Sequence, residues 1–278
     1  MLFRSTFINN SDATVTVHGA TLTVNGVFTN SGTFTMTSGR AVFNGISVNQ
    51  GTWVIDPTTN VFNATHIEYG SLLAAAGDVY LFKSNLVNLS TQNTTWSTLN
   101  TLPGSSGAAG TKFIFDGKGL TGTSLTQEFF TAGLALTGGF VGTPSSATET
   151  QSVTSFGSVT GFQDNFALDR LELGNAGTNS VLLLLDSFPL DGQTASLFVN
   201  DLMIFGTSRL IVSNDVRLYF VNSNNWSLAN IQLLGNGEIH QLVSLNLLSV
   251  IPEPNVLLLF YAGLATLWFA RRRVSQRR

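Results

Sequence analysis

A 19-residue period in the N-terminal third constrains the fold of this chain more than any other feature. The segment 30–34, Asn-Ser-Gly-Thr-Phe, recurs at 49–53 as Asn-Gln-Gly-Thr-Trp, and more loosely at 68–72 as Glu-Tyr-Gly-Ser-Leu. The period holds over about four units, from near Ile8 to near Lys83. Nineteen residues are too few for the helix pair of an α-solenoid, and they suit one coil of a parallel β-helix.

Aligning the units on this period places similar residues in columns. Three columns are apolar: Val15, Phe34, Trp53 and Leu72; Val17, Met36, Ile55 and Ala74; and Val24, Phe43, Phe62 and Leu81. Because residues two apart face the same side of a strand, we expect these columns to fill the interior. Two columns are polar, a hydroxyl ladder at Thr14, Thr33, Thr52 and Ser71 and an internal asparagine ladder at Asn25, Asn44 and Asn63. Stacked amides can hydrogen-bond to one another along the axis.

These columns predict an all-β fold, a right-handed parallel β-helix (β-solenoid) with coils of about 19 residues. The right-handed form is favoured because no hexapeptide sub-period with a recurrent aliphatic residue is present. A β-sandwich with regular turn spacing is the alternative. The expected organisation is repeat coils in 1–90, a less regular insert in 91–165, a C-terminal β module that continues or caps the solenoid in 166–249, and a separate tail in 250–278.

Apolar runs in the C-terminal module predict further strands. They are expected at 168–173, 181–185, 196–205, 209–212, 216–221 and 231–234. The four leucines of 182–185 indicate a strand that is buried on both faces. Residues 127–136, in the insert, favour a short helix.

Charge and cysteine content exclude several classes of function. Five of the 13 lysines and arginines lie in the last eight residues, whereas the 16 acidic residues all lie before them, so the body is acidic. An acidic body argues against nucleic acid as a partner, since the phosphates require a cationic surface. Cysteine is absent, which excludes disulfides, thiolate nucleophiles and cysteine-ligated zinc.

The tail is built of three parts in a fixed order. They are Pro252-Glu253-Pro254, an apolar run over 256–270, and the cluster Arg271, Arg272 and Arg273. The apolar run is long enough for a helix of roughly 22 Å, short of a bilayer core of about 30 Å. The two prolines keep the preceding peptide extended, as a processing enzyme would require. An ordinary C-terminal membrane anchor is the alternative interpretation.

This arrangement resembles the PEP-CTERM sorting signal of Gram-negative bacteria. The resemblance implies an exosortase-type sorting enzyme as partner and residues 256–270 as a transient transmembrane helix in the inner membrane. It also implies export to the cell surface or to an extracellular matrix that contains exopolysaccharide. The stretch 195–219, which ends in a Leu-Tyr pair, resembles a module often found before such tails. Because the N-terminus lacks the apolar stretch of a signal peptide, we expect further residues upstream of Met1.

No catalytic, cofactor or metal site emerges from the spacing of the remaining polar residues. The three histidines, His18, His66 and His240, lack metal-ligand spacing and are interpreted as solvated or locally hydrogen-bonded. The acids considered as catalytic candidates, none of which shares a column with another, are Asp56, Glu68, Asp78 and Asp116. Asp116 is interpreted as part of a turn. The aromatic residues most suited to an exposed position are Trp96 and Trp226.

The expected function is therefore that of a non-enzymatic structural or adhesive protein at the cell surface. Its threonine- and asparagine-rich strands offer hydroxyls and amides to glycans. The alternative is a carbohydrate-active enzyme on the same scaffold, a polysaccharide lyase or hydrolase. Such an enzyme would require a cluster of acids in one groove.

The tail generates a first prediction. If residues 250–278 act as a processed sorting signal, Glu253→Ala should block maturation, because the sorting enzyme would no longer recognise its peptide. Immunoblots of membrane and surface fractions should show a full-length form retained in the membrane. Normal processing and surface delivery of this variant would contradict the exosortase interpretation.

Overall fold

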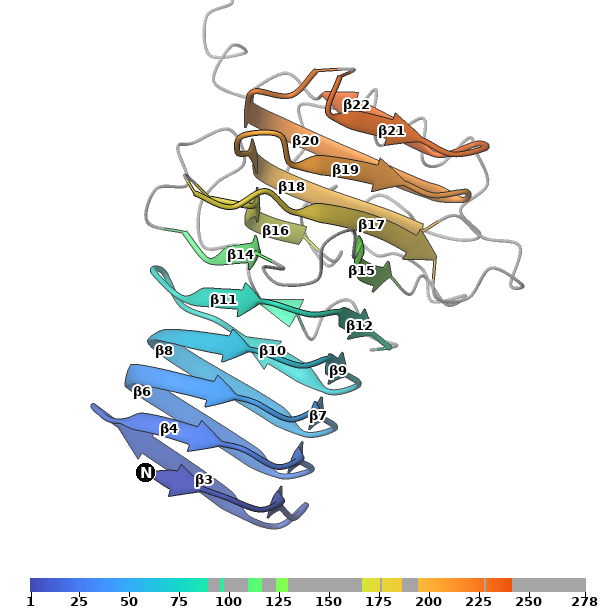
Figure 1. The fold of residues 1–278 in the computed structure, drawn as a ribbon. Coiled ribbons are helices and arrows are strands. Elements are labelled where there is room, and N and C mark those ends of the chain that lie inside the picture. Colours follow the sequence, from blue (N-terminus) through green and yellow to red (C-terminus); the bar gives the residue numbers. More distant parts are fainter. Residues whose placement is uncertain are drawn as a thin grey trace, which may run out of the picture. The chain divides into compact units, whose positions relative to one another are not determined.

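The structure of the chain is a computed structural model that describes residues 1–89, 96–97, 110–116, 124–129, 167–175, 177–186, 195–227 and 229–241. These residues form an all-β parallel β-solenoid of about 8 turns (Figure 1). The described coils lie within one compact unit, Met1–Ser244. The prediction of a parallel β-helix is confirmed, and the β-sandwich alternative is wrong.

Two parallel sheets run along the solenoid, one of 13 strands and one of nine. The larger sheet contains β1 (Leu2–Phe3), β3 (Thr14–His18), β4 (Thr21–Val24), β6 (Thr33–Phe43), β8 (Thr52–Phe62), β10 (Ser71–Leu73), β11 (Val79–Phe82), β13 (Trp96–Ser97), β14 (Lys112–Phe115), β16 (Ala167–Leu173), β18 (Ala195–Ile204), β20 (Val216–Asn224) and β22 (Glu238–Gln241). The smaller sheet contains β2 (Phe7–Asn9), β5 (Phe28–Asn30), β7 (Ser47–Asn49), β9 (His66–Glu68), β12 (Leu86–Asn88), β15 (Ser124–Phe129), β17 (Val181–Asp186), β19 (Arg209–Val212) and β21 (Ile231–Leu233).

The backbone register confirms the predicted period in the N-terminal coils. Thr14 pairs with Thr33, and Thr33 pairs with Thr52, so equivalent residues of successive units lie side by side. Ser71 pairs with Thr52 and extends this column to the next coil. Because parallel pairing repeats every backbone hydrogen bond from coil to coil, identical side chains stack directly above one another.

One predicted column is wrong in its last member. Phe62 pairs with Phe82, and Leu81 pairs instead with Val61. The coil between β8 and β11 is therefore one residue longer than the period. Because side chains alternate along a strand, a shift of one residue turns Leu81 to the outer face and brings Phe82 into the interior.

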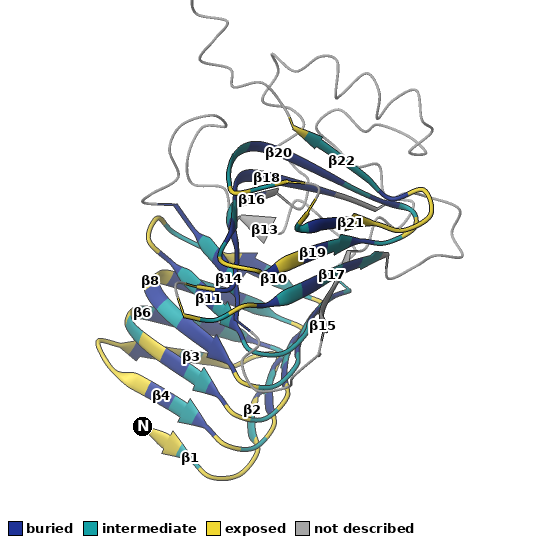
Figure 2. Ribbon diagram, turned by 45° about the horizontal axis from the view of Figure 1, so that its top comes forward, coloured by how far each residue is buried: buried dark blue, intermediate teal, exposed yellow. Residues whose placement is uncertain are grey.

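A column of aromatic rings fills the centre of the solenoid. Phe43 stacks on Phe62 with ring centroids 5.4 Å apart, and Phe62 stacks on Phe82 at 4.9 Å. Phe82 stacks in turn on Phe115 at 5.0 Å. Each of these side chains is at most 1% exposed. Figure 2 shows how buried and more exposed residues alternate along the strands, with buried positions recurring at the same place along successive strands.

The strands from β16 onward continue the same two sheets. Five of the six predicted strands are present within one residue at each end, and β20 runs three residues past its predicted end, to Asn224. Strand β22 was not predicted from the sequence. Leu183 and Leu185 are half-buried, so the leucine run of β17 is buried on its inner face only. The short helix expected from Gln127 is wrong where it overlaps β15, and its other residues lie outside the described ones.

The aromatic column generates a second prediction. Phe43→Ala should lower the free energy of unfolding by about 3–5 kcal/mol, because it leaves a cavity in contact with Phe28, Trp53 and Phe62. Val42→Ala, on the outer side of the same strand, is the matched control and should cost less than about 1 kcal/mol. Denaturant unfolding measures both. Equal losses for the two variants would contradict the assignment of inner and outer faces.

Candidate functional site: polar ladders along the coils

A buried asparagine ladder runs through the smaller sheet. The side-chain amide of Asn9 donates to Asn30 Oδ1 at 2.7 Å, and that of Asn30 donates to Asn49 Oδ1 at 2.7 Å. Asn49 donates in the same way to Glu68 Oε1, also at 2.7 Å. All four side chains are at most 2% exposed. The ladder therefore connects four successive coils from inside the solenoid.

Each asparagine also donates to a backbone carbonyl in the next coil, at the first residue of a strand of the larger sheet. The Nδ2 atom of Asn9 donates to the carbonyl of Thr33 at 2.9 Å, and that of Asn30 to the carbonyl of Thr52 at 3.1 Å. Asn49 repeats this bond to Ser71 at 3.2 Å. Since a buried carbonyl without a partner costs free energy, these bonds fix the turn between the two sheets and the register of the coils.

The ladder ends at a carboxylate that is held by several donors. Glu68 Oε1 accepts from the Gly70 N–H at 2.8 Å, and Glu68 Oε2 lies 3.4 Å from His66 Nε2. His66 Nδ1 lies 2.9 Å from Ser47 Oγ. These are the residue types of a catalytic triad, but the two ring nitrogens have exchanged partners, since in a triad the serine bonds Nε2 and the carboxylate bonds Nδ1. Ser47, His66 and Glu68 are however at most 2% exposed, so a substrate cannot reach them and their role is structural.

The predicted asparagine ladder forms, but it is not internal. Asn44 Nδ2 donates to Asn25 Oδ1 at 2.7 Å, and Asn63 Nδ2 donates to Asn44 Oδ1 at 2.6 Å. All three side chains are exposed. These residues directly follow inward-facing residues at the ends of their strands, so alternation turns their side chains outward.

The same outer corner carries charges in the next coils. Lys83 Nζ lies 3.2 Å from Asp116 Oδ2, and the side-chain amide of Asn175 donates to that oxygen at 2.9 Å. Asp116 was expected to be only part of a turn. Sequence reasoning missed this cluster because the three residues come from coils of irregular length.

The acids do not assemble a catalytic groove among the described residues. Burial raises the pKa of Asp78 to about 6, the N–H groups of Ala75 and Thr58 lower it by donating to the carboxylate, and the nearby charge of Asp56 raises it. Two neighbouring carboxylates with different environments are typical of glycosidases. Here Asp78 is 0% exposed, and its two oxygens accept from Thr58 and Ala75 at 2.6 Å each. Both oxygens of the Asp78 carboxylate are therefore occupied by backbone donors and do not face a substrate site.

The other two histidines are bonded locally, as predicted. His18 Nδ1 lies 2.7 Å from Thr37 Oγ1 on the outer face, and His240 Nε2 lies 2.8 Å from Glu238 Oε2. Within the described part of the chain, no group of three or more His, Cys, Asp and Glu residues could hold a metal ion.

Outward-facing hydroxyls form a second kind of column. Thr14, Thr33, Thr52 and Ser71 lie in register on neighbouring strands, as predicted. Two residues further along the same strands, Thr16 pairs with Thr35. These residues are exposed or half-buried on the outer face. The spacing between the strands, about 4.8 Å, makes the array regular.

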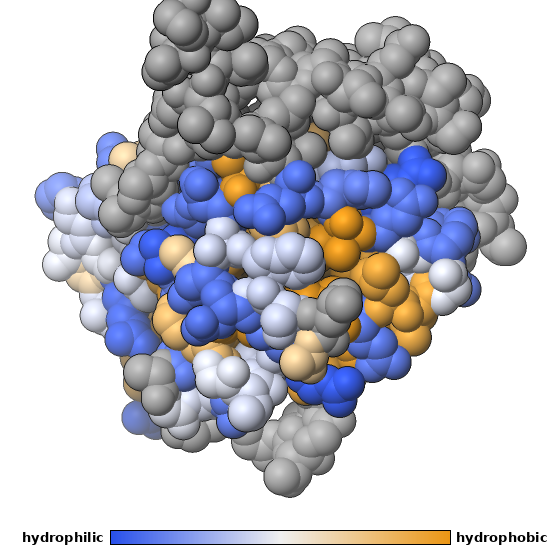
Figure 3. Space-filling view, turned by 90° about the horizontal axis from the view of Figure 1, so that it is seen from above, coloured by the Kyte–Doolittle hydropathy of each residue, from blue (hydrophilic) through white to orange (hydrophobic). Residues whose placement is uncertain are grey.

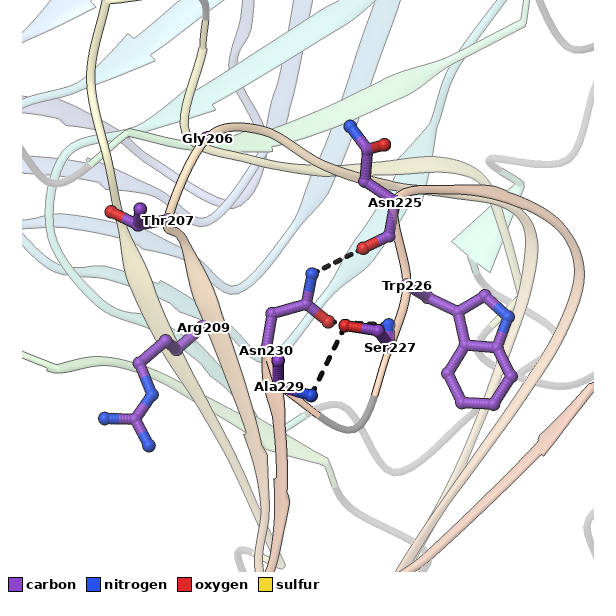
Figure 4. Close-up of a pocket in the computed structure, with 8 residues that line it drawn as sticks. All are labelled: Gly206, Thr207, Arg209, Asn225, Trp226, Ser227, Ala229 and Asn230. Carbon is purple, nitrogen blue, oxygen red and sulfur yellow. Dashed lines mark hydrogen bonds between the residues drawn. The ribbon is translucent and has the colours of Figure 1, made fainter.

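A pocket of about 710 Å³ lies between the β18–β19 turn and the β20–β21 loop (Figure 4). Its lining residues are Gly206, Thr207, Arg209, Asn225, Trp226, Ser227, Ala229 and Asn230. Asn230 holds the loop, since its Nδ2 donates to the Asn225 carbonyl and its Oδ1 accepts from the Ser227 N–H. Trp226 lies on the far side of the loop from Arg209 (Figure 4) and packs edge-on against Phe220 at 5.4 Å.

Trp226 is therefore half-buried against the core, contrary to the exposed position expected from the sequence. The side chain of Trp96 lies outside the described residues. Seen from above, the described surface is mostly hydrophilic, with an apolar patch (Figure 3). The exposed large hydrophobic residues include Leu233, the last residue of β21, and Leu234, which follows it.

The predicted sorting residues, Pro252, Glu253, Pro254, Arg271, Arg272 and Arg273, lie outside the described residues, as does the apolar run 256–270. Among the residues that the structure does describe, no helix is long and apolar enough to cross a membrane. Comparisons of the chain with protein-family models, with curated proteins and with solved structures found no match.

The two asparagine ladders generate a third prediction. Asn30→Ala should cost about 3 kcal/mol of unfolding free energy, because Asn9, Asn49 and the Thr52 carbonyl each lose a buried partner. Asn44→Ala removes the same side chain from the exposed ladder, where water replaces the lost bonds, and should cost less than about 1 kcal/mol. Urea unfolding of both variants tests this. A larger loss for Asn44→Ala would contradict the role given to the buried ladder.

Proposed function

We propose that this chain is a structural or adhesive protein of the cell surface or extracellular matrix of a Gram-negative bacterium. The proposal includes right-handed coils and delivery through a C-terminal PEP-CTERM signal. In that signal, residues 256–270 form a transient transmembrane helix, and an exosortase-type enzyme acts at Pro252-Glu253-Pro254. The support for sorting is the order of the three parts of the tail.

The observation that carries the adhesive role is the in-register hydroxyl array. Thr14, Thr33, Thr52 and Ser71 form one column, and Thr16 and Thr35 begin a second column beside it. A neutral polysaccharide also presents hydroxyl groups at regular intervals along an extended chain. Many individually weak hydrogen bonds, repeated along such a surface, add up to binding through multivalency.

The buried polar groups support a structural scaffold more than an enzyme. The Ser47–His66–Glu68 array lies inside the solenoid, and the Asp78 carboxylate is occupied by backbone donors. The pocket next to Arg209 adds amides, hydroxyls and one guanidinium at the other end of the described coils. These groups would supplement the threonine array in binding a saccharide.

The hydroxyl array generates a fourth prediction. The double variant Thr33→Val and Thr52→Val keeps the branched side-chain shape and removes two hydroxyls from the array. Losing two hydrogen bonds of about 0.5–1.5 kcal/mol each should weaken binding to a neutral polysaccharide about tenfold. Co-sedimentation of the full chain with insoluble cellulose, with an alginate gel as the acidic comparison, measures this.

Thr29→Val, on the outer face of the smaller sheet, is the matched control and should leave binding unchanged. Equal binding of the wild type and the double variant would show that this face does not contact glycan. Absence of wild-type binding to either polysaccharide would contradict the adhesive role.

A further inference from the structure

One outer corner of the solenoid changes from amides to charged groups along its length. The backbone N–H of Asn63 donates to the Phe43 carbonyl, that of Lys83 to the Phe62 carbonyl, and that of Asp116 to the Phe82 carbonyl. Asn63, Lys83 and Asp116 therefore hold the same position in successive coils. The next described coil contributes Gly174, bonded in the same way to the Phe115 carbonyl, and then Asn175. The side chains of Lys83, Asp116 and Asn175 are in contact at this corner.

The cluster places an amine and a carboxamide on the same carboxylate oxygen. Asp116 Oδ2 lies 3.2 Å from Lys83 Nζ and accepts from Asn175 Nδ2 at 2.9 Å. The Asp116 side chain is only 8% exposed, against 30% for Lys83. Asp116 Oδ1 has no hydrogen-bond partner among the described residues. A nearly buried carboxylate with one free oxygen is well placed to accept and return a proton.

The carboxamide of Asn175 is held in a fixed orientation. Its Oδ1 accepts from the Gly177 N–H at 2.9 Å, while its Nδ2 donates to Asp116. The backbone of Asn175 is bonded in both directions to Thr178, at 2.9 and 3.2 Å. An N–H donor on the carbonyl oxygen stabilises the negative charge that develops there when a nucleophile attacks the carbon.

From this geometry we infer that Lys83 and Asn175 form an intramolecular isopeptide bond, with Asp116 as the acid–base group. Asp116 takes a proton from the Lys83 ammonium, and the neutral Nζ attacks Asn175 Cγ. The resulting oxyanion is stabilised by the Gly177 N–H. Asp116 then gives this proton to Nδ2 and accepts the second proton, which Nζ loses once it is bonded to Cγ. The bond between Cγ and Nδ2 breaks, and the departing ammonia takes up the second proton as ammonium, which leaves Asp116 as a carboxylate again. The product is a secondary amide, and the reaction involves neither oxidation nor reduction.

Such a bond would supply covalent stability that this chain lacks by other means. The sequence contains no cysteine, so disulfides are excluded. The bond would join the end of β11 to the end of β16, closing the long chain segment between Lys83 and Asn175. Cross-links of this kind restrict the unfolded chain most when the closed loop is long. An ordinary ion pair between Lys83 and Asp116 would provide no such restriction.

Intact-mass spectrometry of the full chain tests the inference. The wild type should be lighter than its sequence by the mass of one ammonia molecule. A tryptic digest should contain one branched peptide that joins Lys83 to Asn175, with trypsin unable to cut after the modified lysine. A wild-type mass equal to the sequence mass overturns the inference, whatever the variants do. Loss of one water instead would place the bond at Asp116 and overturn the assignment of Asn175.

Three variants separate the roles of the residues. Lys83→Arg keeps the positive charge beside Asp116 but removes the nucleophilic amine, and it should restore the full sequence mass. Asp116→Asn removes the base, and Asn175→Ala removes the carboxamide, with the same expected result. Asn63→Ala alters the same corner in the preceding coil and should leave the cross-link intact. A cross-link that persists in Asp116→Asn would overturn the acid–base role.

Discussion

In-register stacking of parallel coils is the constraint on which the rest of this structure depends. Each coil hydrogen-bonds only to its neighbours, so a side chain at one position meets the equivalent side chain above and below it. Apolar positions become a continuous column of rings, such as Phe43, Phe62 and Phe82. Polar positions become ladders, in which each side-chain amide hydrogen-bonds to the equivalent side chain of the neighbouring coil. A polar residue in the interior is then stabilised only if its neighbouring coils carry a suitable partner.

This rule explains why identical residue types have different roles at two corners. Asn30 and Asn49 are buried and bond both to each other and to backbone carbonyls, so they fix the register of the coils. Asn25 and Asn44 make the same side-chain contact in solvent, where water competes for it. Glu68 ends the buried ladder because its carboxylate accepts from Asn49 but offers no amide to the next coil.

The sequence predicted the repeating coils well because a strict period makes every column visible in one chain. It failed where the period changes. Because the coil before β11 is one residue longer, Phe82 and not Leu81 lies in the core. The sequence separations of 33 and 59 residues, neither a multiple of 19, concealed the contact between Lys83, Asp116 and Asn175. Residues far apart in sequence come together there only through strand pairing, so spacing carried no signal of the cluster.

The sequence by itself determined that this chain is cysteine-free and favoured a parallel β-solenoid over a β-sandwich, because several columns repeat at one period. It also determined that Thr33 and Thr52 lie side by side. Only the tertiary structure decided which asparagine ladder is buried, since asparagines recur at a spacing of 19 residues in both. Burial depends on which side of the turn faces the interior, and that direction is set by packing between the two sheets.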